Sequence, residues 1–136
     1  MTLAEVSNVL LQATVDIIAS DEILLMWYLV ANESIKFQQC LPESQLLILV
    51  RRNYIYSLMR TRLRSQTIPS NQFIYAVALA ASVERKLGNT VSSEYHRGGL
   101  CNLFLIRGGI KTISEMPFPQ SSMIVNVLIE LGLPEL

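Results

Sequence analysis

Apolar residues recur at steps of three and four along most of this chain, a period that belongs to α-helices. No stretch alternates apolar and polar residues over more than a few positions, as a half-buried β-strand would. The 136 residues suffice for one domain and leave no room for a second. We therefore predict an all-α fold, a single-domain antiparallel helical bundle of about six helices that spans residues 1–136. The first apolar stripe consists of Leu3, Val6, Leu10, Ala13 and Ile17.

Capping signals locate the predicted helix ends. Pro42 suits the first turn of a helix, because its missing N–H would have no intrahelical partner there. Ser70 is a favourable N-cap, and Gly88 can adopt the left-handed conformation that follows a last turn. Ser121 or Ser122 is expected to cap the final helix. The first helix should end before Asp21, and later helices should span about 22–38 (the central helix), 42–64, 71–87, 90–107 and 123–133, with a loop after Ile110.

Charge is unevenly distributed, although it sums to zero. Residues 1–43 carry six acids against Lys36 alone, whereas residues 44–83 carry five arginines and no acid. These two parts should attract each other. Within the third helix, Arg51 and Arg62 fall inside the apolar sector, which is formed by Leu47, Val50, Tyr54 and Leu58 and flanked by Ile48, Ile55 and Met59. Because an unpaired charge cannot be buried, both arginines must reach water, pair with an acid or meet a partner.

A glycine pair, Gly98-Gly99, falls in the middle of the fifth predicted helix. Each glycine there costs about 1 kcal/mol relative to alanine, so the pair needs a compensating cause. We expect close packing against the alanine-rich segment 76–81 of the preceding helix, which supplies small side chains. The alternative is a kink, because glycine pairs also bend helices.

The sequence gives little support for a catalytic site or a metal site. His96 and Cys101 lie five positions apart and would diverge by about 140° on a helix, and Cys101 sits in an apolar run that favours an inert thiol. Cys40 and Cys101 form no metal-ligand spacing, and with a single histidine a metal site would need the scattered carboxylates. The glycines match no phosphate-binding loop. We predict no enzyme, no cofactor and no metal, with both cysteines as buried free thiols.

The sequence contains candidate residues for two other kinds of binding site. Arg60, Arg62 and Arg64 are candidate phosphate contacts, but their alternate spacing spreads the charges around the helix, which disfavours direct nucleic-acid binding. Trp27, Tyr28 and Tyr95 could line an internal apolar pocket for a small molecule.

Membrane segments are not expected. The longest apolar runs, 23–31 and 46–50, are well short of the roughly 18 to 20 residues that cross a bilayer. The N-terminus has no basic region before an apolar one, and Glu5 and Asp16 stand where a signal peptide avoids acids. An intracellular location is predicted.

A longer pattern runs from Gly88 through His96 to Ile110 and has the form G-x7-H-x2-GL-x2-L-x3-RGGI. It resembles the regulatory, or middle homology, region of fungal zinc-cluster transcription factors, and the likeness extends more weakly over about residues 10–133. Segments 54–63 and 74–84 are also similar to that family's basic-apolar and alanine-rich helices. The motif residues, which we interpret as structural, are Gly88, His96, Gly99, Leu100, Leu103, Arg107, Gly108 and Gly109.

The resemblance implies a role in transcriptional regulation and a nuclear location. The six-cysteine zinc cluster that reads DNA in such proteins has no counterpart among the two cysteines here. The expected function is therefore a non-catalytic interaction module that forms homo-oligomers or binds a protein partner such as a full-length factor. An exposed apolar helix over 123–133 would be its signature. The alternative is a small-molecule-sensing helical domain with the internal apolar pocket.

Overall fold

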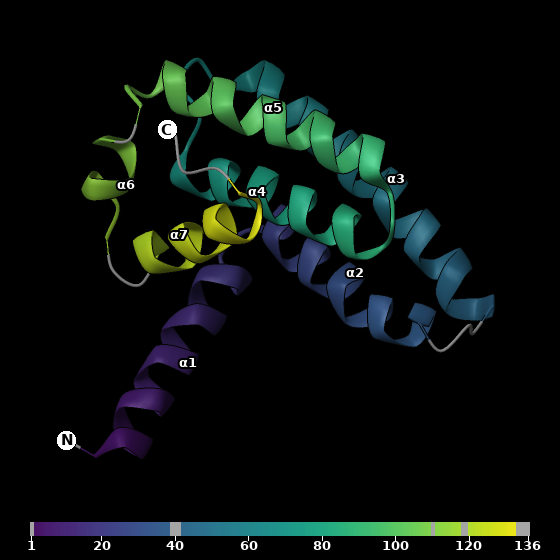
Figure 1. Cartoon of the computed structure of the whole chain (residues 1–136), viewed down its shortest axis with the longest axis horizontal. Coiled ribbons are helices and arrows are strands. Elements are labelled where there is room, and N and C mark those ends of the chain that lie inside the picture. The colour runs from purple at the N-terminus through teal and green to yellow at the C-terminus, as the bar shows by residue number, and fades with distance from the viewer. Residues whose placement is uncertain (1, 39–41, 110, 118–119, 133–136) are drawn as a thin grey trace.

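The computed structural model describes residues 2–38, 42–109, 111–117 and 120–132, and these residues form α-helices and no β-strand (Figure 1). The all-α class is confirmed, while the antiparallel bundle of about six helices stays a prediction. No helix in this part of the chain is long and apolar enough to cross a membrane. The helices are α1 (Leu3–Ala19), α2 (Glu22–Gln38), α3 (Pro42–Ser65), α4 (Asn71–Lys86), α5 (Thr90–Ile106), α6 (Lys111–Glu115) and α7 (Gln120–Glu130).

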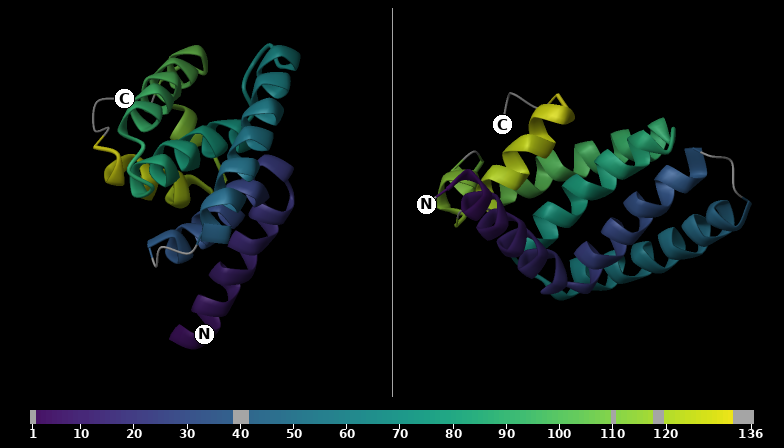
Figure 2. Two further views of the ribbon diagram at one scale, coloured as in Figure 1. Left: turned by 90° about the vertical axis from the view of Figure 1, so that its right-hand side faces the viewer. Right: turned by 90° about the horizontal axis from the view of Figure 1, so that it is seen from below.

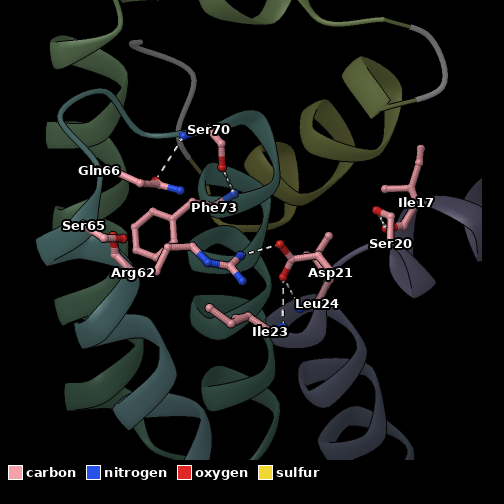
Figure 3. Close-up of polar contacts among 10 residues, drawn as sticks. All are labelled: Ile17, Ser20, Asp21, Ile23, Leu24, Arg62, Ser65, Gln66, Ser70 and Phe73. Carbon is pink, nitrogen blue, oxygen red and sulfur yellow. Dashed lines mark hydrogen bonds and ion pairs between the residues drawn. The ribbon is translucent and has the colours of Figure 1, made fainter.

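Side-chain caps fix several helix starts. The Ser70 hydroxyl accepts a hydrogen bond from the Phe73 amide at 3.1 Å, as predicted for the N-cap of α4 (Figure 3). Asp21 begins α2 in the same way, because its carboxylate accepts hydrogen bonds from the amides of Ile23 and Leu24. Gly88 has a φ of +85° just beyond α4, which confirms the predicted left-handed stop.

Helix α4 forms the centre of the core. Its residues from Phe73 to Glu84 are buried apart from the half-buried Leu79, and it packs against α5, α2 and α7 (Figures 1 and 2). Helix α2 packs against α1, α3 and α4 but leaves Leu25 and Leu29 exposed, so it is not buried on most sides as predicted for a central helix. By contrast, α1 leads away from the other helices (Figures 1 and 2). Ile17 near its end packs on the core, whereas Leu3 near its start is 88% exposed.

Two details of the predicted elements need correction. On α3 the buried apolar face is centred on Ile48, Ile55 and Met59, which had been placed at its flank, whereas Val50 and Tyr54 are exposed. The α2 helix approaches α3 from that flank and therefore decides which side is buried. After residue 110 the expected loop contains the short helix α6.

The last helix also differs from its prediction. Ser121 and Ser122 lie inside α7 and do not cap it. The apolar residues Ile124, Val127 and Leu128 are buried, because α7 docks on α4. An exposed apolar helix over 123–133 was therefore the wrong signature for the described part of that segment, although Ile129 on its outer side remains 73% exposed.

The glycine pair in α5 does not do what was predicted. Helix α5 is indeed the main packing partner of α4, and the Ser93 hydroxyl donates a hydrogen bond to the Ala81 carbonyl at 2.8 Å. However, Gly98 is exposed and Gly99 half-buried, and a Cβ added to either would meet nothing within 4 Å. Close packing of this pair against the alanines of α4 is therefore wrong.

Candidate functional site

The chain has one histidine and one tryptophan, and their rings lie against each other on the inner side of α5. His96 Nε2 lies 3.0 Å from the Tyr56 hydroxyl, and the two rings stack with centroids 5.4 Å apart. Trp27, which is fully buried, presents its ring at a steep angle to both, with centroids 5.7 Å from Tyr56 and 6.4 Å from His96. We call Trp27, Tyr56 and His96 the aromatic cluster; it joins α2, α3 and α5.

An ion pair borders this cluster on the α4 side. Arg52 on α3 donates from Nε and Nη2 to the two carboxylate oxygens of Glu84, at 2.6 and 2.5 Å. Glu84 has no exposed surface, so the fork-shaped guanidinium supplies the charge and the hydrogen bonds that a buried carboxylate needs. The same guanidinium lies 5.8 Å from the centroid of the Tyr56 ring, within range of a cation–π contact.

Burial and these neighbours determine the protonation states in the cluster. Desolvation lowers the pKa of His96, and Arg52 lowers it further, although Glu84 opposes both. Burial, followed by the charge and side-chain hydrogen bond of Glu84, raises the pKa of Tyr56. For Arg52, desolvation alone would lower the pKa, but the hydrogen bond and charge of Glu84 outweigh it and the net shift is upward. At neutral pH the cluster therefore holds a neutral imidazole and a neutral phenol beside one compensated ion pair.

Sequence reasoning did not assign Arg52, Tyr56 or Glu84 to a site. A signal was present, because Glu84 follows Val77, Ala80 and Ala81 at steps of seven, four and three and so shares their helix face. An acid on an apolar face requires a cation on the element packed against it. Which of the five arginines supplies it could not be read from spacing alone.

The motif residues serve the fold in several ways. Leu100 and Leu103 are buried in the core, and Gly108 and Gly109 have positive φ and end α5 as predicted. Arg107 donates to the Pro69 carbonyl and to Asn71 Oδ1, each at 2.8 Å, and so ties the end of α5 to the start of α4.

Two of the five arginines of α3 meet acids of the N-terminal part, which agrees with the expected attraction for these two. Arg62 pairs with Asp21 (Figure 3), and Arg51 lies 3.9 Å from Glu33. Arg60 and Arg64 are exposed. The three candidate phosphate contacts are thus not equivalent, because Arg62 is already engaged within the chain.

The three residues proposed for an internal pocket are placed differently from one another. Trp27 is buried, and the Tyr28 hydroxyl lies 3.2 Å from that of Tyr75. Tyr95 is 79% exposed and touches the His96 ring from outside, with centroids 5.7 Å apart. As a wall of an internal pocket Tyr95 was the wrong choice, because it lies on the opposite side of α5 from the core.

The outward side of α5 carries an exposed and largely apolar stripe, here called the α5 outer face. Val91, Tyr95, Leu105 and Ile106 are 87%, 79%, 72% and 62% exposed. The central line of this face consists of Val91, Tyr95, Gly98, Asn102 and Leu105. These residues follow one another at steps of four, three, four and three, which is the spacing of residues that contact a second helix in a coiled coil.

The cysteines and the acids add no further site. Cys101 is half-buried with a free thiol, so it is less buried than predicted, and Cys40 lies outside the described residues. Within the described ranges, no three or more His, Cys, Asp or Glu side chains gather in an arrangement that could hold a metal ion. Comparison with protein-family models, curated proteins and solved structures finds no match for this chain.

Proposed function

We propose that this chain is a non-catalytic regulatory module that associates with a second copy of itself through the α5 outer face. The resemblance of residues 88–110 to the regulatory regions of fungal zinc-cluster factors supports a role in transcriptional regulation in the nucleus. On this proposal the aromatic cluster holds α5 in place from beneath, and the outer face of the same helix makes the contact.

The observation that carries the proposal is the position of Gly98. A mid-helix glycine costs about 1 kcal/mol relative to alanine, and packing within the described chain does not require it, because its Cβ would meet open space. At the centre of an apolar stripe, a glycine lets a second helix approach closely. Flanking apolar side chains then supply the area whose burial drives association.

A second exposed apolar region, on α3, fits a partner helix less well. Leu46, Leu49 and Val50 are 64%, 49% and 57% exposed, but the same side of α3 continues into Asn53, Ser57, Arg60 and Arg64. Burying those two arginines against a second copy would place like charges together. The central line of the α5 outer face carries no charge.

A matched pair of variants tests the proposal by sedimentation equilibrium. Leu105 on α5 and Ile129 on α7 are equally exposed, at 72% and 73%, so a glutamate at either should cost the monomer little. Leu105→Glu should weaken self-association by about tenfold or more, because it places an unpaired charge in the contact. Ile129→Glu should leave the association constant unchanged. Equal association of the wild type and both variants would reject the α5 outer face.

Recognition of a small molecule is the second candidate function, and one observation favours it. Trp27 Nε1 is buried and has no hydrogen-bond partner among the described residues. A buried donor of this kind is ordinarily paired. A ligand with an apolar body and one acceptor should then raise the melting temperature of the wild type and not of Trp27→Phe. A panel without any such difference would remove this candidate.

A further inference from the structure

We propose that the two copies of α5 pack antiparallel and cross at Gly98, with the Tyr95 hydroxyl of each copy hydrogen-bonded to Asn102 of the other. This inference rests on the proposed self-association through the α5 outer face and deepens it, because it states which residues of the two surfaces meet. It follows from the order of side chains along the central line of that face.

Gly98 lies at the middle of α5, equally far along the chain from Thr90 at its start and Ile106 at its end. Val91 and Leu105, near the two ends of the central line, are also equally distant from it. A closed pair of identical chains uses the same surface on both copies, related by a two-fold axis. A crossing at Gly98 therefore lets the two helices overlap along their full length, whether they run parallel or antiparallel.

A parallel orientation would keep the two helices from meeting closely at Gly98. In a parallel pair each residue of the central line faces its own copy, so the Tyr95 ring would meet the Tyr95 ring of the second copy. At a rise of about 1.5 Å per residue, these rings would lie about 4.5 Å along the helix from Gly98. Tyr95 is 79% exposed and has the largest side chain on the line. Two such rings would hold the helices apart where the glycine permits a close approach.

An antiparallel orientation places large side chains opposite smaller ones on both sides of Gly98. Tyr95 then lies opposite Asn102 of the second copy, and Val91 lies opposite Leu105. Helical side chains lean toward the N-terminus, so Tyr95 leans away from the crossing and Asn102 leans toward it, which brings the two to about the same level. The positive N-terminal end of each helix also lies beside the negative C-terminal end of the other.

The polar side chains of the central line need partners once the contact excludes water. Tyr95 and Asn102 are both exposed in the single copy, and burying either without a hydrogen bond would oppose association. In the antiparallel pair the phenol O–H donates to Oδ1 of Asn102 in the second copy, and the two-fold axis repeats this bond. Within one copy the two residues lie about 10 Å apart along the helix, so the bond forms only between copies.

Sedimentation equilibrium of charge variants of the full chain decides the orientation. Val91→Glu and Leu105→Lys each replace an exposed side chain, at 87% and 72%, by a charge that suits its end of α5, so both should fold. Each single variant should associate about tenfold more weakly than the wild type. The double variant should associate about fivefold more tightly than either, because in an antiparallel pair each new carboxylate faces a new ammonium group. In a parallel pair each new charge would face its own copy, and the double variant would be the weakest.

Tyr95→Phe and Asn102→Ala, measured singly and together, test the hydrogen bond without added charge. Both residues are exposed, so the single copy should keep its fold, which circular dichroism checks. Each single variant should weaken association several-fold. The double variant should lose no more than the more affected single one, because the first substitution already removes the bond.

Two results would overturn the antiparallel pair and leave the proposed function in place: a double charge variant weaker than both single ones, or losses in Tyr95→Phe and Asn102→Ala that add in full. A wild type that does not associate, or variants that all associate as tightly as the wild type, would reject the α5 outer face and the antiparallel pair with it. One set of measurements therefore distinguishes the two failures.

Discussion

At the scale of single residues, the burial of Glu84 depends on its ion pair with Arg52. It is a fully buried carboxylate whose two oxygens both bind one arginine, and that arginine keeps part of its side chain in water. Removing one member of such a pair is far more damaging than replacing both, because the remaining charge stays buried without compensation. The pair therefore fixes the register of α3 against α4.

We expect Arg52→Met to lower the free energy of unfolding by about 3 to 5 kcal/mol, since Glu84 would then be a buried acid without its cation. Urea denaturation at neutral pH measures this loss. The matched control is Arg60→Met on the exposed side of the same helix, which should change stability by no more than about 0.5 kcal/mol. Similar losses in the two variants would mean that the ion pair adds nothing beyond the packing of a long side chain.

Some of these side-chain contacts could be predicted from the sequence and others could not. The attraction between the acidic N-terminal part and the arginines of α3 was predictable from charge counts, and the contacts of Arg62 with Asp21 and Arg51 with Glu33 agree with it. The partner of Glu84 was not predictable, because it depends on the rotation of α3 about its axis. That rotation is set by where α2 packs, which spacing along α3 does not reveal.

At the scale of elements, α5 has two faces with different roles. Its inner side carries His96, Leu100 and Phe104 into the core, and its outer side exposes the stripe that contains Gly98. Helix ends were the most predictable part of the fold, because Ser70 and Gly88 act locally through one hydrogen bond and one dihedral angle. The role of Gly98 was mispredicted because the helix period shows which residues share a face of α5. It does not show which neighbouring helix lies against that face.

Gly98→Ala should separate folding from association. The added methyl meets open space within the chain, so the monomer should gain up to about 1 kcal/mol of stability from the better helix propensity of alanine. Self-association should weaken, because the methyl prevents the close approach of the second α5. Thermal unfolding at low concentration and sedimentation equilibrium measure the two effects. An alanine that strengthened both would show that close approach at Gly98 is not used.

At the scale of the whole molecule, the helices contribute unequally to the structure. Helices α2, α3 and α5 meet at the aromatic cluster, α7 packs against α4, and the start of α1 leads away from the other helices (Figures 1 and 2). The all-α class followed from the apolar period alone. The projection of α1 and the docking of α7 could not be predicted from that period. Both depend on which of several apolar helix faces packs against the core.

The central claim, association through the α5 outer face, is tested most directly by methyl NMR over a range of protein concentrations. Val91 and Leu105 should show resonances that shift with concentration toward a common dimer state, whereas Leu46 on α3 and Ile129 on α7 should keep constant positions. Shifts confined to Leu46, Leu49 and Val50 would assign the contact to α3 instead. A spectrum that stays constant up to the solubility limit, from a chain that sediments as a monomer, would show that the chain does not associate with itself.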